Sequence, residues 1–197
     1  MSTEIIAAII VGVAGIIATV ITLIAQRNKN KIKMQNAVIL KQWSNSPDIS
    51  PLFTQAQSVI YICTHSAFGW SAYLGILLAQ PNIKLNLLVA DSNNENLIKA
   101  YGAVKNRDFH PIDETIFKRL REHPNIEIRV IDSLMPTTFI ARDVDTNDGY
   151  IRAFHNFNDT DDAVFLDFAK DDNWYQIYHR QLKIIWERGE LFFINSK

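Results

Sequence analysis

Two arginines and a histidine lie among apolar residues on either side of an acidic stretch in residues 137–157, with the sequence TTFIARDVDTNDGYIRAFHNF. Its alternating residue types are typical of two strands joined by an acidic turn. Arg142 then lies on the first strand, and Arg152 and His155 lie on opposite faces of the second. A buried guanidinium is costly unless it is paired, so each arginine is expected to lie at the rim, pair with an aspartate, or bind an anion. His155 has the chemistry of a nucleophile or general base near neutral pH.

A second group of polar residues follows two expected strands, at residues 58–64 and 83–91. Thr64, His65 and Ser66 close the first strand and precede a helix, whose amino end suits a phosphate or a carboxylate. Asp91 closes the second strand, where it is placed to bind a ribose hydroxyl or a metal ion. The alternatives are structural: Thr64 or Ser66 caps the helix, His65 is solvated, and Asp91 is an ordinary turn residue.

Other kinds of chemistry have no motif in this sequence. It contains no glycine-rich phosphate loop, no metal-binding cysteine or histidine pair, and no G-x-S-x-G elbow. Its clustered acidic residues lack the ligand spacing and central glycine of a calcium loop. These residues are Asp159, Asp161, Asp162, Asp171 and Asp172. We therefore expect no metal and no cofactor.

Strand and helix patterns alternate along the first part of the sequence that follows residue 54. Expected strands at residues 58–64, 83–91 and 126–132 are separated by expected helices at residues 68–80 and from Pro111 to just before Pro124. This order predicts right-handed crossovers and a parallel β-α-β-α-β half, with helices covering the faces of the sheet.

The pattern changes after residue 136. Three expected strands, at residues 137–144, 149–157 and 162–169, are joined by short polar turns, which predicts an antiparallel meander. A last helix is expected at residues 173–188 and ends at Gly189. The fold class is therefore α/β, with one mixed sheet flanked by helices.

Composition limits the partners that this chain can have. Its 197 residues are 48% hydrophobic, which suits one globular domain with an appendage. The formal net charge of −1 does not favour binding nucleic acid, so we expect no nucleic-acid partner. The single cysteine, Cys63, lies in an expected buried strand and excludes a disulfide within the chain.

The amino-terminal segment predicts a membrane anchor. An uncharged run begins at Ile5, ends at Ala25, and is long enough to cross the roughly 30 Å of a bilayer core as a helix. Basic residues follow it, and positive flanks stay on the cytoplasmic side. These residues are Arg27, Lys29, Lys31 and Lys33. We expect a single-pass protein of the inner membrane with its amino end outside: an anchor (residues 1–33), a juxtamembrane linker with a short helix (residues 34–54), and a cytosolic domain (residues 55–197).

The order of elements, with a closing helix that spaces Tyr178 and Trp186 as Y-x7-W, resembles the phospholipase D-like superfamily, and most closely its divergent single-half members. The resemblance extends from about Gln55 to Phe193, and it implies a homodimer. Active members carry H-x-K-x4-D on the hairpin, where the histidine attacks phosphorus and the lysine holds the phosphate.

That motif is not intact here. In one register Thr138 and Ile140 replace the histidine and the lysine, and only Asp145 remains. In the other register His155 is followed by Phe157 at the lysine position, with Asp162 at the aspartate position. Loss of the lysine removes the main counter-charge of the phosphate.

Three functions follow from these observations. The first is a membrane-anchored cytosolic sensor or effector of degenerate phospholipase D-like fold, a pseudoenzyme that binds a phosphate-containing or nucleotide-like ligand. Its ligand residues would be Thr64, His65, Ser66, Asp91, Arg142 and Arg152. The second is an active phosphodiesterase or nuclease in which His155 is catalytic. The third is a non-catalytic protein-interaction platform at the inner membrane.

Overall fold

The computed structural model describes residues 37–40, 48–65, 71–105, 109, 114–155 and 163–196. These residues belong to one compact unit, Asn36–Lys197. The expected anchor between Ile5 and Ala25 lies outside the described residues and stays a prediction. No helix within the described part of the chain is both long and apolar enough to cross a bilayer.

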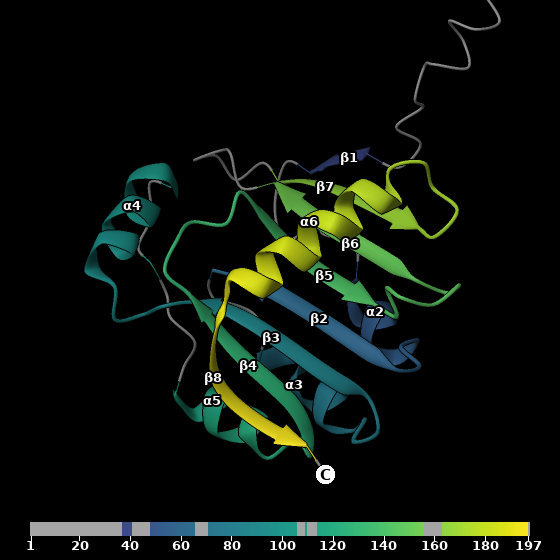
Figure 1. Cartoon of the computed structure of the whole chain (residues 1–197), viewed down its shortest axis with the longest axis horizontal. Coiled ribbons are helices and arrows are strands. Elements are labelled where there is room, and N and C mark those ends of the chain that lie inside the picture. Colours follow the sequence, from purple (N-terminus) through teal and green to yellow (C-terminus); the bar gives the residue numbers. More distant parts are fainter. Residues whose placement is uncertain are drawn as a thin grey trace, which may run out of the picture. The chain divides into compact units, whose positions relative to one another are not determined.

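An eight-stranded mixed sheet forms the centre of this unit, with the strand order β1-β7-β6-β5-β2-β3-β4-β8 (Figure 1). Its parallel part consists of β2 (Val59–Thr64), β3 (Lys84–Ala90) and β4 (Asn125–Ile131). These strands are rich in leucine and β-branched residues, and most of their side chains are buried. Such strands are typical of parallel sheets that are covered on both faces.

The antiparallel part extends the sheet from β2. β5 (Thr137–Arg142) pairs with β2, and β6 (Tyr150–His155) and β7 (Ala163–Ala169) follow as a meander. β1 (Ala37–Leu40) pairs with β7 at one edge, and β8 (Glu190–Ser196) pairs with β4 at the other. The expected parallel half and antiparallel meander are therefore confirmed.

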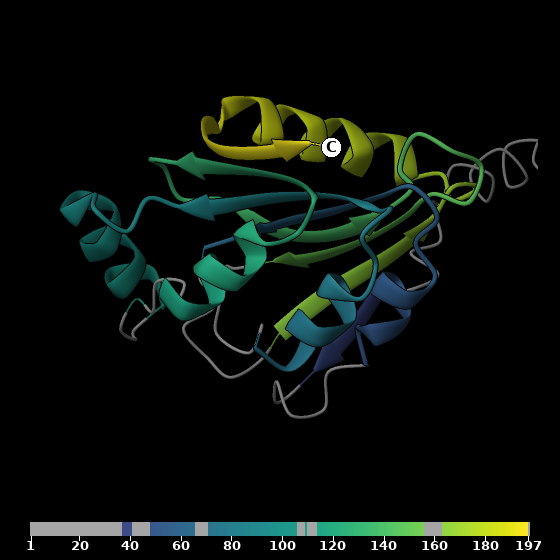
Figure 2. The same ribbon diagram turned by 90° about the horizontal axis from the view of Figure 1, so that it is seen from below.

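Helices cover both faces of the sheet. α2 (Ser50–Thr54), α3 (Ser71–Leu78) and α5 (Glu114–Arg121) lie on one face, and α6 (Tyr175–Arg188) lies on the other (Figure 2). One buried apolar cluster includes residues of α2, α3 and α5, and a second includes residues of α6. Two packed layers thus hold the sheet rigidly and fix the position of the side chains at its edges.

Some elements differ from the expectation. The prediction of a juxtamembrane helix is wrong for residues 37–40, which form the strand β1 and pair with β7. Four apolar residues are too few to distinguish a helix period from a strand period. α4 (Glu95–Lys105) is a helix that no pattern named above predicted. The short helix α2 and the strand β8 were not expected. The closing helix is confirmed, and it ends at Gly189.

Gly189 ends α6, but it does not adopt the left-handed conformation that often places glycine at a helix end. Its φ of −72° and ψ of 134° are those of extended backbone. A Cβ at this position would collide with the Leu88 side chain on β3 and lie 3.0 Å from Cβ of Arg129 on β4. Glycine is needed here because the chain passes very close to the sheet as it turns from α6 into β8.

Candidate functional site

The carboxyl ends of the parallel strands bring several expected site residues to one edge of the sheet. Thr64 and His65 lie at the end of β2, and Asp91 follows β3. The register of β5 and β6 pairs Thr137 with His155 at the same edge. The side chain of His155 and the whole of Ser66 lie outside the described residues.

His65 is built into the core at this edge. Its side chain is buried, and the backbone N–H of Met135 donates a 2.6 Å hydrogen bond to its Nε2. A ring nitrogen that accepts a hydrogen bond carries no proton, so this contact selects the neutral imidazole protonated on Nδ1. His65 also packs against Tyr101, with ring centroids 5.5 Å apart. The residue fastens the segment that precedes β5 to the end of β2.

Asp91 shapes the turn into α4. Its carboxylate accepts a 2.9 Å hydrogen bond from the N–H of Asn93, and its own N–H donates to the Ile131 carbonyl at 2.9 Å. The next asparagine, Asn94, accepts from the N–H of Leu97 at 3.1 Å and caps the helix. Among the described residues this edge carries polar and acidic side chains, and none of them is a lysine or an arginine. They are Thr64, His65, Asp91, Asp132, Thr137 and Thr138.

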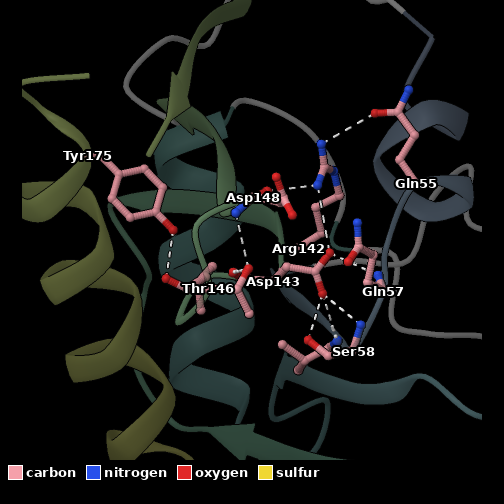
Figure 3. Close-up of polar contacts among 10 residues, drawn as sticks. Gln55, Gln57, Ser58, Arg142, Asp143, Thr146, Asp148 and Tyr175 are labelled. Carbon is pink, nitrogen blue, oxygen red and sulfur yellow. Dashed lines mark hydrogen bonds and ion pairs between the residues drawn. The ribbon is translucent and has the colours of Figure 1, made fainter. Parts of the chain in front are cut away.

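Arg142 lies at the opposite edge, in a network centred on Asp143 (Figure 3). Its guanidinium donates to the Asp148 carbonyl at 2.8 Å and to Oε1 of Gln55 at 3.3 Å, and it lies 3.7 Å from the Asp143 carboxylate. The Asp143 carboxylate is fully buried and accepts hydrogen bonds from the loop that precedes β2. This network joins the β5–β6 turn to the start of β2.

Arg152 is held by a cross-strand partner. It lies opposite Asp167 in the β6–β7 register, and its Nε and Nη2 donate to the two carboxylate oxygens of Asp167 at 2.6 and 2.8 Å. Burial lowers the pKa of Arg152, but Asp167 raises it by more, so the guanidinium stays charged. The structure therefore does not bring Arg142 and Arg152 together with Thr64, His65 and Asp91.

The hairpin position that corresponds to the phosphate-holding lysine is part of the core. Ile140 is 3% exposed and packs in the apolar cluster beneath α2 and α3. Thr138, at the histidine position, is half-buried. In this register neither side chain offers a nucleophilic nitrogen or a positive charge.

A basic cluster that we did not expect lies on the other face, under α6. It consists of Lys170, His179 and Lys183 with the carboxylate of Asp145. Lys183 Nζ donates to Oδ2 of Asp145 at 2.8 Å, and His179 Nε2 lies 3.1 Å from Oδ1. His179 and Lys183 come from adjacent turns of α6, which places them on one face of the helix.

Neighbouring groups fix this cluster in place. Lys183 Nζ also donates to the hydroxyl of Tyr61 on β2 at 3.1 Å, and it lies 4.9 Å from the Tyr61 ring centroid. Lys170 Nζ donates to the Val144 carbonyl at 3.3 Å. The Tyr175 hydroxyl donates to the same carbonyl at 2.8 Å, and burial raises the pKa of Tyr175 to about 12.

The surroundings shift the pKa values of the groups in the cluster in different directions. Burial lowers the pKa of Lys183, but its contacts with Asp145 and Tyr61 raise it by more, so Lys183 stays charged. Burial raises the pKa of Asp145, while hydrogen bonding to Lys183 and the charges of Lys183 and His179 lower it below its usual value. Burial and both lysines lower the pKa of His179, against the opposing effect of Asp145. Lys183 is thus the charged partner of the Asp145 carboxylate, and Lys170 adds a second positive charge near His179.

This arrangement is suited to an anion. The Asp145 side chain is 60% exposed, whereas those of His179 and Lys183 are 20% and 29% exposed. The His179 and Lys183 side chains are therefore less exposed than the Asp145 side chain that they bind, and a phosphate oxygen can accept the same hydrogen bonds as its carboxylate. The i, i+4 spacing of His179 and Lys183 was visible in the sequence, but their proximity to Asp145 depends on tertiary structure.

No protein-family model and no curated protein matches this sequence. Solved structures do match its fold. Phosphatidylserine synthase of Haemophilus influenzae matches with a TM-score of 0.51 at 14% identity, over 79% of this chain and 39% of the synthase. Nuc of Salmonella typhimurium, a phospholipase D family member, matches with a TM-score of 0.47 at 12% identity, over 79% of this chain and 98% of Nuc.

The archaeal chromatin protein TrmBL2 matches with a TM-score of 0.49 at 13% identity, over 96% of this chain and 66% of TrmBL2. This chain spans less than two thirds of both the synthase and TrmBL2. At such identities the similarity is one of fold, and the activities of these proteins do not transfer with it. The synthase match agrees with the fold that the order of strands and helices in the sequence predicts. The chain therefore has a phospholipase D-like fold.

Proposed function

We propose that this chain is a membrane-anchored sensor or effector that binds a phosphate-containing ligand through the basic cluster and does not hydrolyse it. One observation carries the proposal: Lys183 and His179 both contact the single, largely exposed carboxylate of Asp145, and the charge of Lys170 acts on His179 beside them. The amino-terminal run from Ile5 to Ala25 remains the proposed anchor, with the domain on the cytoplasmic side.

Asp145 acts in this proposal as the internal occupant of the anion site. Its two oxygens each meet one nitrogen, Lys183 Nζ at 2.8 Å and His179 Nε2 at 3.1 Å. A phosphate monoester carries up to two negative charges and three acceptor oxygens, so it satisfies the same nitrogens and adds charge. Because Asp145 is largely exposed, it can turn toward solvent when the phosphate enters.

The absence of hydrolysis follows from the hairpin. Ile140 occupies the core where an active member places lysine, and a phosphohistidine intermediate formed in that register would lack its main counter-charge. The basic cluster supplies charge for binding, but Asp145 and His179 meet on the α6 face of the sheet, whereas Ile140 lies on the opposite face. A role for His155 in catalysis is the competing hypothesis, and it is tested in parallel below.

Calorimetry on the full-length chain in detergent tests the binding proposal, with glycerol 3-phosphate, adenosine monophosphate and inorganic phosphate as probes. We expect Lys183→Met to weaken binding about tenfold, which corresponds to roughly 1.4 kcal/mol. Lys118→Met is the matched control, because Lys118 is an exposed lysine on α5 that is remote from the cluster. Failure of all three probes to bind, or equal losses in both variants, would refute the proposal.

Hydrolysis is tested separately with bis-p-nitrophenyl phosphate. We expect no release of nitrophenol by the wild-type chain or by His155→Ala. Turnover by the wild-type chain that disappears in His155→Ala would replace the sensor proposal with the phosphodiesterase alternative.

A further inference from the structure

One buried polar side chain in the middle of the sheet has no partner for its oxygen. Asn86 on β3 is 1% exposed, and its Oδ1 accepts no hydrogen bond from any residue that the structure describes. A buried amide oxygen without a donor lowers the stability of a fold, so native proteins rarely keep one without another use for it. Asn86 is therefore a candidate for contact with a ligand.

Asn86 is the centre of a row of three polar side chains. The sheet register pairs it with Tyr61 on β2 and with Glu127 on β4. Neighbouring strands lie about 4.8 Å apart, so this row is about 10 Å long. Tyr61 packs against Trp186 of α6, with ring centroids 5.5 Å apart, which places the row on the face of the sheet that carries α6.

One end of the row adjoins the basic cluster. Lys183 Nζ donates to the Tyr61 hydroxyl at 3.1 Å and to Oδ2 of Asp145 at 2.8 Å. A phosphate that accepts from Lys183 in place of Asp145 therefore lies beside Tyr61, at the start of the row. The organic part of a phosphate ester can then extend over Asn86 toward Glu127.

Long side chains border the other end of the row. Lys84 Nζ lies 3.2 Å from Oε2 of Glu127, and Arg129 Nη2 lies 2.7 Å from Oε1. The side chains of Lys84 and Arg129 are 48% and 25% exposed. On this face α6 crosses the antiparallel strands and leaves the amino-terminal halves of β3 and β4 uncovered (Figure 1). Side chains that can change rotamer thus border the row here, and their movement can admit a ligand to Asn86.

The groups in the row are suited to hydroxyl groups. The Asn86 amide offers both a donor and an acceptor, and the Glu127 carboxylate is an acceptor. The Tyr61 hydroxyl can donate while it accepts from Lys183. Because a hydroxyl group also donates and accepts, a ligand with several of them can satisfy Oδ1 of Asn86 and the neighbouring groups together.

A flat nucleobase fits this surface less well. Tyr61 is 8% exposed, and Lys183 Nζ lies 4.9 Å from its ring centroid. Trp186 is 7% exposed, and the Arg129 guanidinium lies 4.8 Å from its ring centroid. Cations and core packing thus cover both rings, and neither offers an open face on which a base could stack.

We propose that Tyr61, Asn86 and Glu127 bind the hydroxyl groups of a polyhydroxylated phosphate monoester, such as a sugar phosphate, whose phosphate lies in the basic cluster. The inference rests on the proposed function, because the cluster supplies the contacts to the phosphate. It adds the class of the ligand and the residues that select it. Asn86 then lowers stability but is kept for binding, a known trade-off at ligand sites.

Calorimetry on the full-length chain, in a detergent without a sugar headgroup, tests the inference with two matched probes. Glucose 6-phosphate supplies the hydroxyl groups, and cyclohexylmethyl phosphate keeps a six-membered ring and the phosphate without them. We expect the wild type to bind glucose 6-phosphate about tenfold more tightly, the effect of one or two net hydrogen bonds. Adenosine monophosphate should bind less tightly than glucose 6-phosphate, because its base has no stacking surface.

Substitutions of Asn86 identify the residue that recognises the hydroxyl groups. Asn86→Leu and Asn86→Ala should each bind the two matched probes equally, and the smaller alanine serves if leucine does not fit. Asn125→Leu is the matched control, because Asn125 lies on the same face of β4 by strand alternation but outside the row. The control should keep the tenfold preference. Melting temperatures equal to or above that of the wild type establish that the Asn86 variants fold.

The outcomes separate this inference from the proposed function. Equal binding of the two probes by the wild type, a preference that survives in both Asn86 variants, or tighter binding of adenosine monophosphate would each overturn the inference and leave the phosphate site standing. A preference that survives would mean that Asn86 contacts only water. Failure of every probe to bind would overturn the phosphate site and this inference together.

Discussion

Replacement of Asp143 should reveal a large polar contribution to the fold. The buried carboxylate accepts hydrogen bonds from Gln57 N (2.9 Å), Ser58 N and Oγ (both 2.7 Å) and Val59 N (3.1 Å). Hydrogen bonds to a charged group contribute about 1.5–3 kcal/mol each, and a shared acceptor makes them less than additive. We expect Asp143→Ala to lower the free energy of unfolding by about 4 kcal/mol, the range seen when a buried ion pair loses one partner.

The backbone of Asp143 separates two causes of this loss. Its φ of 50° is in the left-handed region, which aspartate, asparagine and glycine tolerate better than alanine. Asp143→Gly should therefore be about 1 kcal/mol more stable than Asp143→Ala. Asp143→Asn should be the mildest change, because one amide oxygen can keep the contacts with Ser58 and Val59 while the contact with Gln57 is lost.

Urea unfolding of the full-length chain, followed by tryptophan fluorescence, measures these differences. Burial raises the pKa of Asp143, but the hydrogen bonds from Ser58, Gln57 and Val59 lower it by more, to below its usual 3.8. A carboxyl group whose pKa is lower in the folded chain than in the unfolded chain stabilises the fold at pH values above its unfolded pKa. This stabilisation is lost as the pH falls through the folded pKa. The advantage of the wild type over Asp143→Asn should therefore shrink below about pH 4. A loss of less than about 1 kcal/mol in Asp143→Ala would refute the assigned role.

Three further outcomes are expected. Asp167→Ala leaves the Arg152 guanidinium buried without its bidentate partner, so the free energy of unfolding should fall by about 3 kcal/mol in urea titrations, and an unchanged midpoint would contradict this. Gly189→Ala should lower the melting temperature, with a loss of about 1–3 kcal/mol, because the new Cβ collides with Leu88; a melting temperature equal to the wild type's would show that the chain relaxes freely there. Sulfate, whose charge is constant between about pH 5 and 8, should bind more tightly as pH falls through the pKa of His179, which lies below 6.5. In His179→Gln the calorimetric affinity should not depend on pH, and a retained dependence would assign the proton to another group.

Much of the fold follows from long patterns in the sequence. The parallel half is visible as three short apolar runs separated by helical patterns, and α6 is visible as one stripe of apolar residues. α4 was missed because Asn93 and Asn94, which precede it, are of a residue type that is also typical of loops. The structure shows that Asn94 caps α4, so the same residue type that indicates a turn also marks the start of a helix. β1 is too short for its period to be recognised.

The polar contacts depend on distances that no local pattern contains. Arg142 and Arg152 were recognised as groups that need a partner, and Asp167 could be identified as one of these partners only after the β6–β7 register was known. Lys183 and Asp145 are 38 residues apart, and α6 joins them by packing across the sheet. The sequence therefore supplied the candidate charges, and the fold decided which of them meet.

Phosphorus NMR of the full-length chain mixed with glycerol 3-phosphate and bis-p-nitrophenyl phosphate tests binding and hydrolysis together. We predict that the glycerol 3-phosphate line broadens with the wild-type chain and with Lys118→Met but stays sharp with Lys183→Met. We also predict that no product line grows from the diester. A line that is equally sharp with all three proteins, or a product line from the wild-type chain, would contradict a non-hydrolysing phosphate site at the basic cluster.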